Sequence, residues 1–131
     1  MQLETRKAQL FMQIYSRLDD NEFWENYGKM VWEFEYESMD DFLEKYGPGT
    51  ETGGYAAYMS LTAFFRGIGV LVEKELIDID VVDELVGVIT KRVWEKIKPL
   101  ARDHRERFDY SREGKWVEYL VNKIVEKDQN N

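Results

Sequence analysis

The stretch from about Gly53 to Leu76 constrains the fold more than any other part of this chain. Placed on a helical wheel, its apolar residues cover a wide arc that consists of Ala57, Leu61, Phe64, Phe65, Ile68, Leu71, Val72 and Leu76. A helix that is apolar around most of its circumference needs neighbours on most of its sides. The sequence therefore predicts a helix over about 53–76 at the centre of a helical bundle.

The same stretch approaches the about 20 apolar residues that a transmembrane helix needs. However, Arg66 lies near its centre, where a charged side chain is costly in a bilayer. Four glycines also dilute its apolar character. We therefore expect a helix of a water-soluble bundle and no membrane span.

Apolar residues recur at helical spacing in five further segments, and no strand-like alternation of useful length interrupts them. We expect these helices over 2–18, 21–36, 39–46, from the Asp80 cap to about Arg107, and over about 112–127. The chain of 131 residues suits one domain. The prediction is an all-α fold, a single domain over 1–131 built as a bundle of five or six helices.

Polar residues in front of these segments predict where the helices begin. Asp20, Ser38, Asp80 and Ser111 are the expected N-caps, because their side-chain oxygens accept hydrogen bonds from unpaired N–H groups of the first turn. Pro99 should kink or restart the helix that carries it, because proline lacks the N–H of the helical ladder.

The composition excludes several kinds of chemistry. The chain has no cysteine, so disulfides, thiolate metal sites and cysteine nucleophiles are absent, and a cytoplasmic location is expected. The N-terminal residues also lack the apolar run of a signal peptide. The net charge of −8 disfavours a nucleic-acid partner.

Charge is divided unevenly along the sequence. Segment 19–51 carries eleven acidic and two basic residues, whereas segment 91–107 carries seven basic and three acidic residues. These segments are either separately solvated helix faces or surfaces that attract each other, within one chain or between chains. A nucleic-acid accessory role would have to use the basic segment.

Known catalytic and metal-binding patterns are missing. His104 is the only histidine, and no acid precedes it by three residues, as the Glu-x-x-His pairs of di-metal bundles require. The Asp78-Ile-Asp80 sequence is interpreted as helix capping, because a helix follows too soon for a calcium loop. His104 is expected to be partly buried and structural. We expect no catalytic residues, no metal and no cofactor.

Arg66 is the most informative single residue. It shares a narrow polar seam with Thr62 and Glu73 beside the apolar arc. Glu73 is seven residues away, about 10 Å along the helix axis, so a direct pair is strained. The seam predicts either a structural ion pair with Glu33, Glu35 or Glu37, or a pocket in which these seam residues bind an anionic ligand. The glycines at 47–54 offer a weaker possible anion site at the start of the same helix.

Trp32 and Tyr36 point away from the predicted core face of their helix. They are therefore exposed, covered by another segment, or part of a subunit contact. Aromatics make up 15% of the chain, a surplus that indicates an interface, where aromatic residues are enriched. Trp32 and Tyr36 are the predicted interface residues.

Three motifs in the second half carry a family resemblance. They are Phe64-Phe-Arg-Gly-Ile-Gly-Val-Leu-Val-Glu-Lys-Glu-Leu-Ile-Asp78, Trp94-Glu-Lys-Ile-Lys-Pro-Leu100 and Trp116-Val-Glu-Tyr-Leu120. Over about residues 60–122 the chain resembles a family of small all-helical proteins of unknown function. The resemblance implies a helical fold and no assigned activity.

The function that these observations favour is that of a non-enzymatic interaction or assembly protein that self-associates, in the first place as a homodimer. The alternative is a small-molecule-binding or enzymatic bundle whose pocket Arg66 lines. A nucleic-acid accessory role ranks third.

Overall fold

A computed structural model describes residues 2–108 and 114–129. The described residues form six α-helices, one π-helical turn and no strand, so the prediction of an all-α bundle is confirmed. The elements are α1 (Gln2–Leu18), α2 (Asn21–Gly28), the π-turn η1 (Lys29–Glu33), α3 (Met39–Tyr46), α4 (Gly54–Glu73), α5 (Ile79–Phe108) and α6 (Lys115–Gln129).

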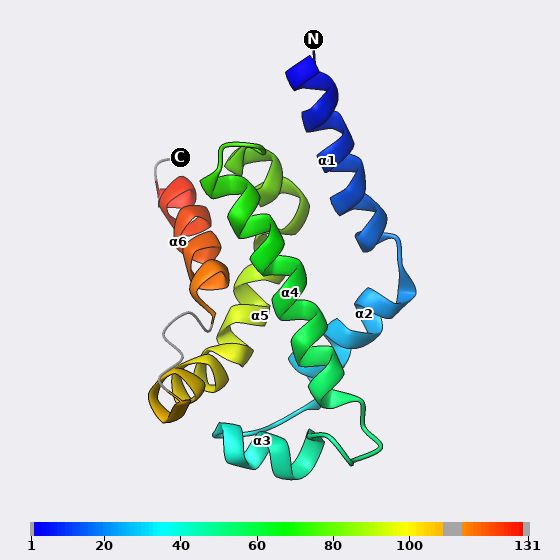
Figure 1. The fold of residues 1–131 in the computed structure, drawn as a ribbon, viewed down its shortest axis with the longest axis vertical. Helices are drawn as coiled ribbons and strands as arrows, with labels where there is room; N and C mark the ends of the chain where they lie inside the picture. Colours follow the sequence, from blue (N-terminus) through cyan, green and yellow to red (C-terminus); the bar gives the residue numbers. More distant parts are fainter. Residues whose placement is uncertain (1, 109–113, 130–131) are drawn as a thin grey trace.

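The arrangement places α4 at the crossing point of the other elements. It contacts α2, η1, α3, α5 and α6, as expected for the central helix, and it passes in front of α5 in Figure 1. α6 lies on one side of this pair and α2 on the other, while α3 covers one end. α1 extends away from the body of the molecule (Figure 1).

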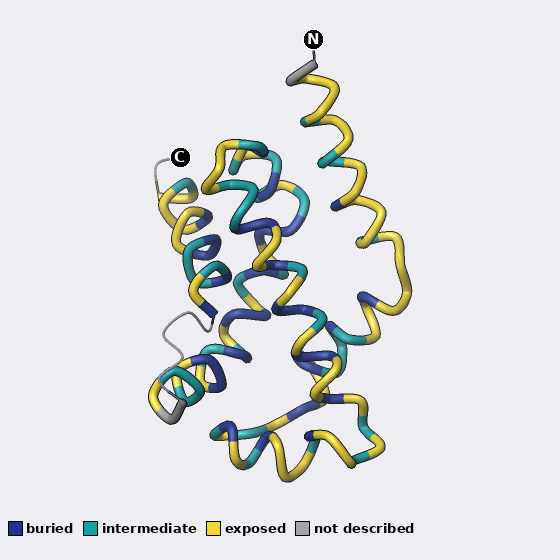
Figure 2. The backbone as a smooth tube through the Cα atoms, in the orientation of Figure 1, coloured by how far each residue is buried: buried dark blue, intermediate teal, exposed yellow. Residues whose placement is uncertain are grey.

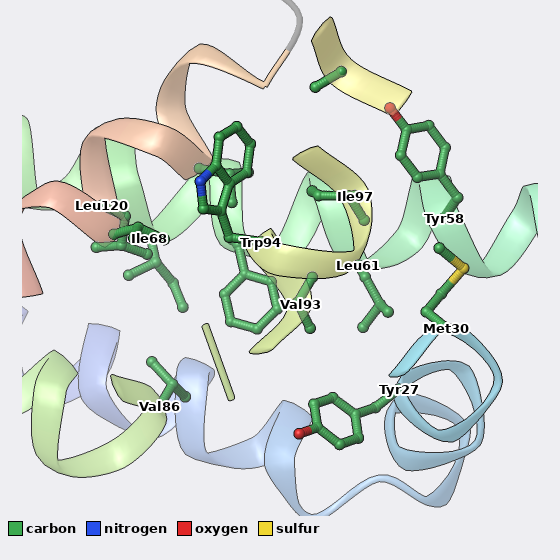
Figure 3. Packing of buried hydrophobic residues seen from close by; sticks show 14 of the residues in the cluster. Tyr27, Met30, Tyr58, Leu61, Ile68, Val86, Val93, Trp94, Ile97 and Leu120 are labelled. Atoms are coloured by element: carbon green, nitrogen blue, oxygen red, sulfur yellow. The ribbon is translucent and has the colours of Figure 1, made fainter. Parts of the chain in front are cut away.

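The core is formed by side chains from several helices. Figure 3 shows Tyr27 and Met30 from the α2–η1 segment, Leu61 and Ile68 from α4, and Leu120 from α6 pointing toward the centre. Val86, Val93, Trp94 and Ile97 of α5 complete this cluster of buried side chains. In α1, by contrast, Ile14 is the only buried side chain among those described (Figure 2).

Two of the predicted N-caps are confirmed by their hydrogen bonds. The Asp20 carboxylate accepts from the Glu22 N–H at 3.0 Å. The Ser38 hydroxyl accepts from the Asp41 N–H at 3.1 Å, and the Asp41 carboxylate accepts from the Glu37 N–H at 3.0 Å. This reciprocal pattern is a variant of the capping box, and it fixes the start of α3 where the sequence predicts it.

The predicted helix over 21–36 is shorter than expected. It widens into the π-turn η1, in which the Phe34 N–H donates to the Lys29 oxygen five residues earlier, and ends at Glu33, and the chain from Phe34 to Glu37 is not helical. Phe34 there adopts an extended backbone and stacks on Tyr46 with ring centres 3.9 Å apart. Aromatic packing against α3 therefore takes the place of the last helical turn.

The predicted helix over 53–76 also ends early, at Glu73. Its end is a Schellman motif in which the Leu76 N–H donates to the Leu71 oxygen and the Glu75 N–H to the Val72 oxygen. Glu75 holds the left-handed position of this motif with φ of 60°, where glycine is the usual residue. The chain then turns directly into α5.

α5 begins at Ile79, so the expectation that Asp80 is its N-cap is wrong. The Asp78 main-chain oxygen accepts from the Val81 and Val82 N–H groups, which leaves Asp80 inside the first turn. The helix continues through Pro99 without interruption, and its last part changes direction in Figure 1, as expected for a kink at proline.

The last helix starts at Lys115, three residues after the predicted start. Gly114 precedes it with φ of +72°, which an L side chain rarely adopts. A Cβ at Gly114 would also lie 2.8 Å from the Ala101 side chain. The predicted cap, Ser111, lies outside the described residues.

Candidate functional site

The polar seam of α4 does not form the buried pair that the sequence suggested. Thr62 is buried, but Arg66 and Glu73 are exposed. Arg66 makes no ion pair with any residue that the structure describes, and Glu73 pairs with Lys74 at 3.7 Å. The prediction of a carboxylate partner from Glu33, Glu35 or Glu37 is therefore wrong, because an exposed guanidinium is solvated and needs no buried acid.

The exposure of Arg66 has a structural cause, which is that the neighbours of α4 cover only part of its circumference. Six residues are exposed on one side of the helix, and we call them the outer face of α4: Tyr55, Ala56, Met59, Ala63, Arg66 and Gly67. Tyr55 is 36% and Met59 44% exposed. Arg66 is the only charged residue among these six, and the exposed Glu73 continues the same side at the C-terminal end of α4.

By length and composition α4 is the one helix among the described residues that could span a membrane. Only 44% of its apolar stretch is buried. The predicted apolar arc is nevertheless covered, because each of its residues is buried or half-buried, as expected for the central helix. The most apolar helix of the chain keeps an uncovered side.

A second exposed aromatic surface lies at the π-turn. Trp32 is 69% exposed, and the guanidinium of Arg92 on α5 lies 5.6 Å from the centre of its ring. Such a pair is a cation–π contact, and π-helical turns occur frequently at functional sites. Trp32 is thus a large aromatic side chain presented to solvent on a turn that packs against α4 and α5.

Tyr36, the other predicted interface residue, is covered by another segment. It is half-buried, and its hydroxyl donates to the Lys96 main-chain oxygen at 2.6 Å. The Lys96 ammonium in turn donates to the Phe34 main-chain oxygen at 3.0 Å. Burial, and to a smaller degree the nearby Tyr46, raises the pKa of the Tyr36 hydroxyl above its usual range. Tyr36 thus anchors the segment after the π-turn to α5.

The acidic and basic segments lie against each other within the chain. Their contacts include the Met39 N–H donating to the Asp103 carboxylate at 2.9 Å and the Lys96 ammonium 5.6 Å from the Tyr36 ring centre. In these contacts a charged group meets a main-chain group or a ring rather than an opposite charge. Ten of the eleven acids in segment 19–51 are exposed, so this segment keeps a strongly negative surface.

The histidine and aspartates that the sequence offers for metal or acid–base chemistry take part in the packing of α5. His104 is partly buried on α5, as expected. Asp80 pairs with Lys127 at 3.9 Å, and Asp83 pairs with the same lysine at 3.0 Å, which links α5 to α6. This hydrogen bond to Asp83 raises the pKa of Lys127. No three His, Asp or Glu side chains within 2–108 and 114–129 are grouped as a metal site requires.

Two hollows in the surface border α4. An open one of about 500 Å³ lies where α4 turns into α5, and Glu73 and Lys123 are among its lining residues. An apolar groove of about 170 Å³ lies between α1 and α4 at Leu10 and Phe64. Arg66 lines neither hollow, so the three seam residues do not form one binding pocket there.

The chain matches no protein-family description, no characterised protein and no solved structure in the three comparisons made with known proteins.

Proposed function

We propose that this protein is a non-enzymatic, cytoplasmic interaction protein that self-associates as a dimer through the outer face of α4. The observation that carries the proposal is the uncovered side of the most apolar helix in the chain. Burying apolar surface is favourable by about 25 cal/mol per Å². A partner that covers Tyr55 and Met59 would therefore bury apolar surface that the described part of the chain leaves exposed.

A protein partner fits this face better than an enclosed small ligand. Interfaces are often built from an apolar centre with charged groups toward the rim. Tyr55 and Met59 offer such a centre, and Arg66 is the only charged residue among the six described residues of the outer face. An anion site would instead need an enclosing hollow, and Arg66 lies outside both of the hollows described above.

Trp32 supports a second candidate, in which a different protein binds at the π-turn. Tryptophan is enriched among the residues that dominate binding energy at interfaces. Here the indole is 69% exposed, and hydrogen bonds of the neighbouring segment to α5 hold its turn in place. A rigid, exposed anchor loses little conformational entropy on binding.

Sedimentation velocity of the wild-type chain tests the proposal. We expect a monomer–dimer equilibrium in the range of about 1–100 µM, because an interface smaller than the standard size gives modest affinity. Met59→Lys should shift the chain to monomer, since it places a charge in the centre of the proposed contact. Val88→Lys is the matched control, because Val88 is an exposed apolar residue of α5.

Two results would contradict the proposal. One is a wild-type chain that stays monomeric throughout this range of concentration. The other is a monomer that floats with phosphatidylcholine vesicles, which would mean that a lipid surface covers α4. If Trp32→Ala rather than Met59→Lys abolishes the dimer, the assembly surface is the π-turn and not the outer face of α4.

A further inference from the structure

We propose that the outer face of α4 pairs with the same face of a second copy in antiparallel orientation, with each Arg66 meeting Glu51 of the partner subunit. The inference rests on the proposed self-association and specifies its geometry. The two residues at its centre are an exposed cation and an exposed acid. Neither has an ion-pair partner among the residues that the structure describes.

The charge pattern of α4 selects the direction of pairing. Arg66 and Glu73 are the only charged residues within α4, and both are exposed along the same side of the helix, with Glu73 in its last turn beyond the six residues of the outer face. Parallel helices related by a two-fold axis would bring the two Arg66 side chains together, and like charges opposed across an interface are costly. Antiparallel helices separate them and also align the helix dipoles favourably.

The register follows from where an acid is available. With Met59 beside the two-fold axis, Arg66 lies about 10 Å from that axis along the helix. The residue of the partner subunit that Arg66 faces must then lie a similar distance before position 59, in the loop that precedes α4. Glu51 is in this loop and is exposed.

The same register matches the shapes of the apolar side chains. Tyr55 and Ala63 lie four residues on either side of Met59, so each tyrosine ring faces an alanine of the partner subunit. Ala56, also on the outer face, adds no bulk between the helices. Small residues permit the close approach at which helices pack, about 8–10 Å between their axes.

An alternative register would pair Arg66 with Glu73 of the partner subunit. It places the two-fold axis at the level of Gly69 and Val70, close to the C-terminal end of α4. Glu73 already pairs with Lys74. This register would also leave Tyr55 and Met59 uncovered, so the Glu51 register accounts for more of the exposed surface.

Charge reversal tests the pairing. Arg66→Glu and Glu51→Arg should each weaken the dimer about tenfold or more, because symmetry applies each change twice. The double variant Arg66→Glu/Glu51→Arg should restore the dissociation constant to near that of the wild type. Lys74→Glu makes the same change of charge at an exposed residue outside the outer face and should have no effect.

The outcomes separate this inference from the proposed function. A wild-type monomer overturns both. A wild-type dimer that both single reversals leave unchanged overturns the Arg66–Glu51 pairing alone. Arg66→Glu can also be combined with Glu73→Arg. If this double variant restores the dimer and Arg66→Glu/Glu51→Arg does not, the alternative register is correct. Far-UV circular dichroism of each variant checks that the helical fold is kept.

Discussion

The Tyr36 hydroxyl donates a 2.6 Å hydrogen bond to the main-chain oxygen of Lys96, and the ammonium of that lysine lies 5.6 Å from the Tyr36 ring centre. Tyr36 and Lys96 are 60 residues apart, so this contact fixes the segment after the π-turn onto α5. It also sets the position of Trp32 four residues earlier.

Tyr36→Phe should lower the free energy of unfolding by about 1 kcal/mol, the net contribution of one hydrogen bond. The raised pKa of Tyr36 adds a dependence on pH. The folded chain holds this proton above pH 10, where an unfolded tyrosine releases it, so wild-type stability should fall as the pH rises past about 10. Urea unfolding at pH 7 and pH 10.5 measures both effects. The Phe variant should lose less stability between these two values, and an equal loss in both proteins would contradict the account.

Two buried threonines should respond in opposite ways to loss of the hydroxyl. The Thr62 hydroxyl has no hydrogen-bond partner within the described part of the chain, whereas the Thr90 hydroxyl donates to the Val86 oxygen at 2.6 Å. Thr62→Val should therefore raise the free energy of unfolding by about 1 kcal/mol, and Thr90→Val should lower it by a similar amount. Thermal unfolding of the two variants measures the difference. A lower stability for Thr62→Val would show that its hydroxyl is bonded in solution.

Gly67 and Gly69 make a matched pair on α4. A Cβ at Gly69 would lie 2.5 Å from the Trp116 main-chain oxygen, so Gly69→Ala should cost about 1–3 kcal/mol by forcing α6 away. A Cβ at Gly67 meets nothing within 4 Å, so Gly67→Ala should gain about 0.5–1 kcal/mol from helix propensity. Chemical denaturation of both variants tests this. Equal effects would mean that α4 and α6 are not in close contact at Gly69.

The left-handed backbone of Glu75 offers a stabilising substitution. A non-glycine residue pays about 1–2 kcal/mol to adopt this conformation, so Glu75→Gly should raise the midpoint of thermal unfolding. Glu75→Ala keeps the Cβ and serves as the control, with no comparable gain expected. If both variants behave alike, the effect comes from loss of the charge and not from the backbone.

Local sequence patterns predicted the helices and most of their ends. The ranges 2–18 and 39–46 agree with α1 and α3, and the predicted start at 21 agrees with α2, because spaced apolar residues and the Asp20 and Ser38 caps are local signals. The π-turn was missed because its apolar spacing resembles that of an α-helix. The position of Phe34 depends on Tyr46, a long-range contact that no periodicity reports.

The candidate site was less predictable than the fold. A helical wheel showed that Arg66 borders an apolar arc, but not which part of that arc the other helices cover. The wheel likewise does not show which glycine of α4 a neighbouring helix approaches: a Cβ at Gly69 would meet the Trp116 main chain of α6, whereas a Cβ at Gly67 meets nothing within 4 Å. The exposure of Arg66 and the surroundings of the two glycines both depend on how the other helices pack against α4. Helical periodicity within one segment does not report this packing.

The most direct test of self-association through α4 uses the absence of cysteine from the chain. A single Met59→Cys variant should form a disulfide-linked dimer under mild oxidation, because the proposed two-fold axis brings the two copies of residue 59 together. Val88→Cys, at a site that is 60% exposed on α5, should remain monomeric under the same conditions. Non-reducing electrophoresis gives the result. Monomeric Met59→Cys, or equal cross-linking of the two variants, would contradict the account.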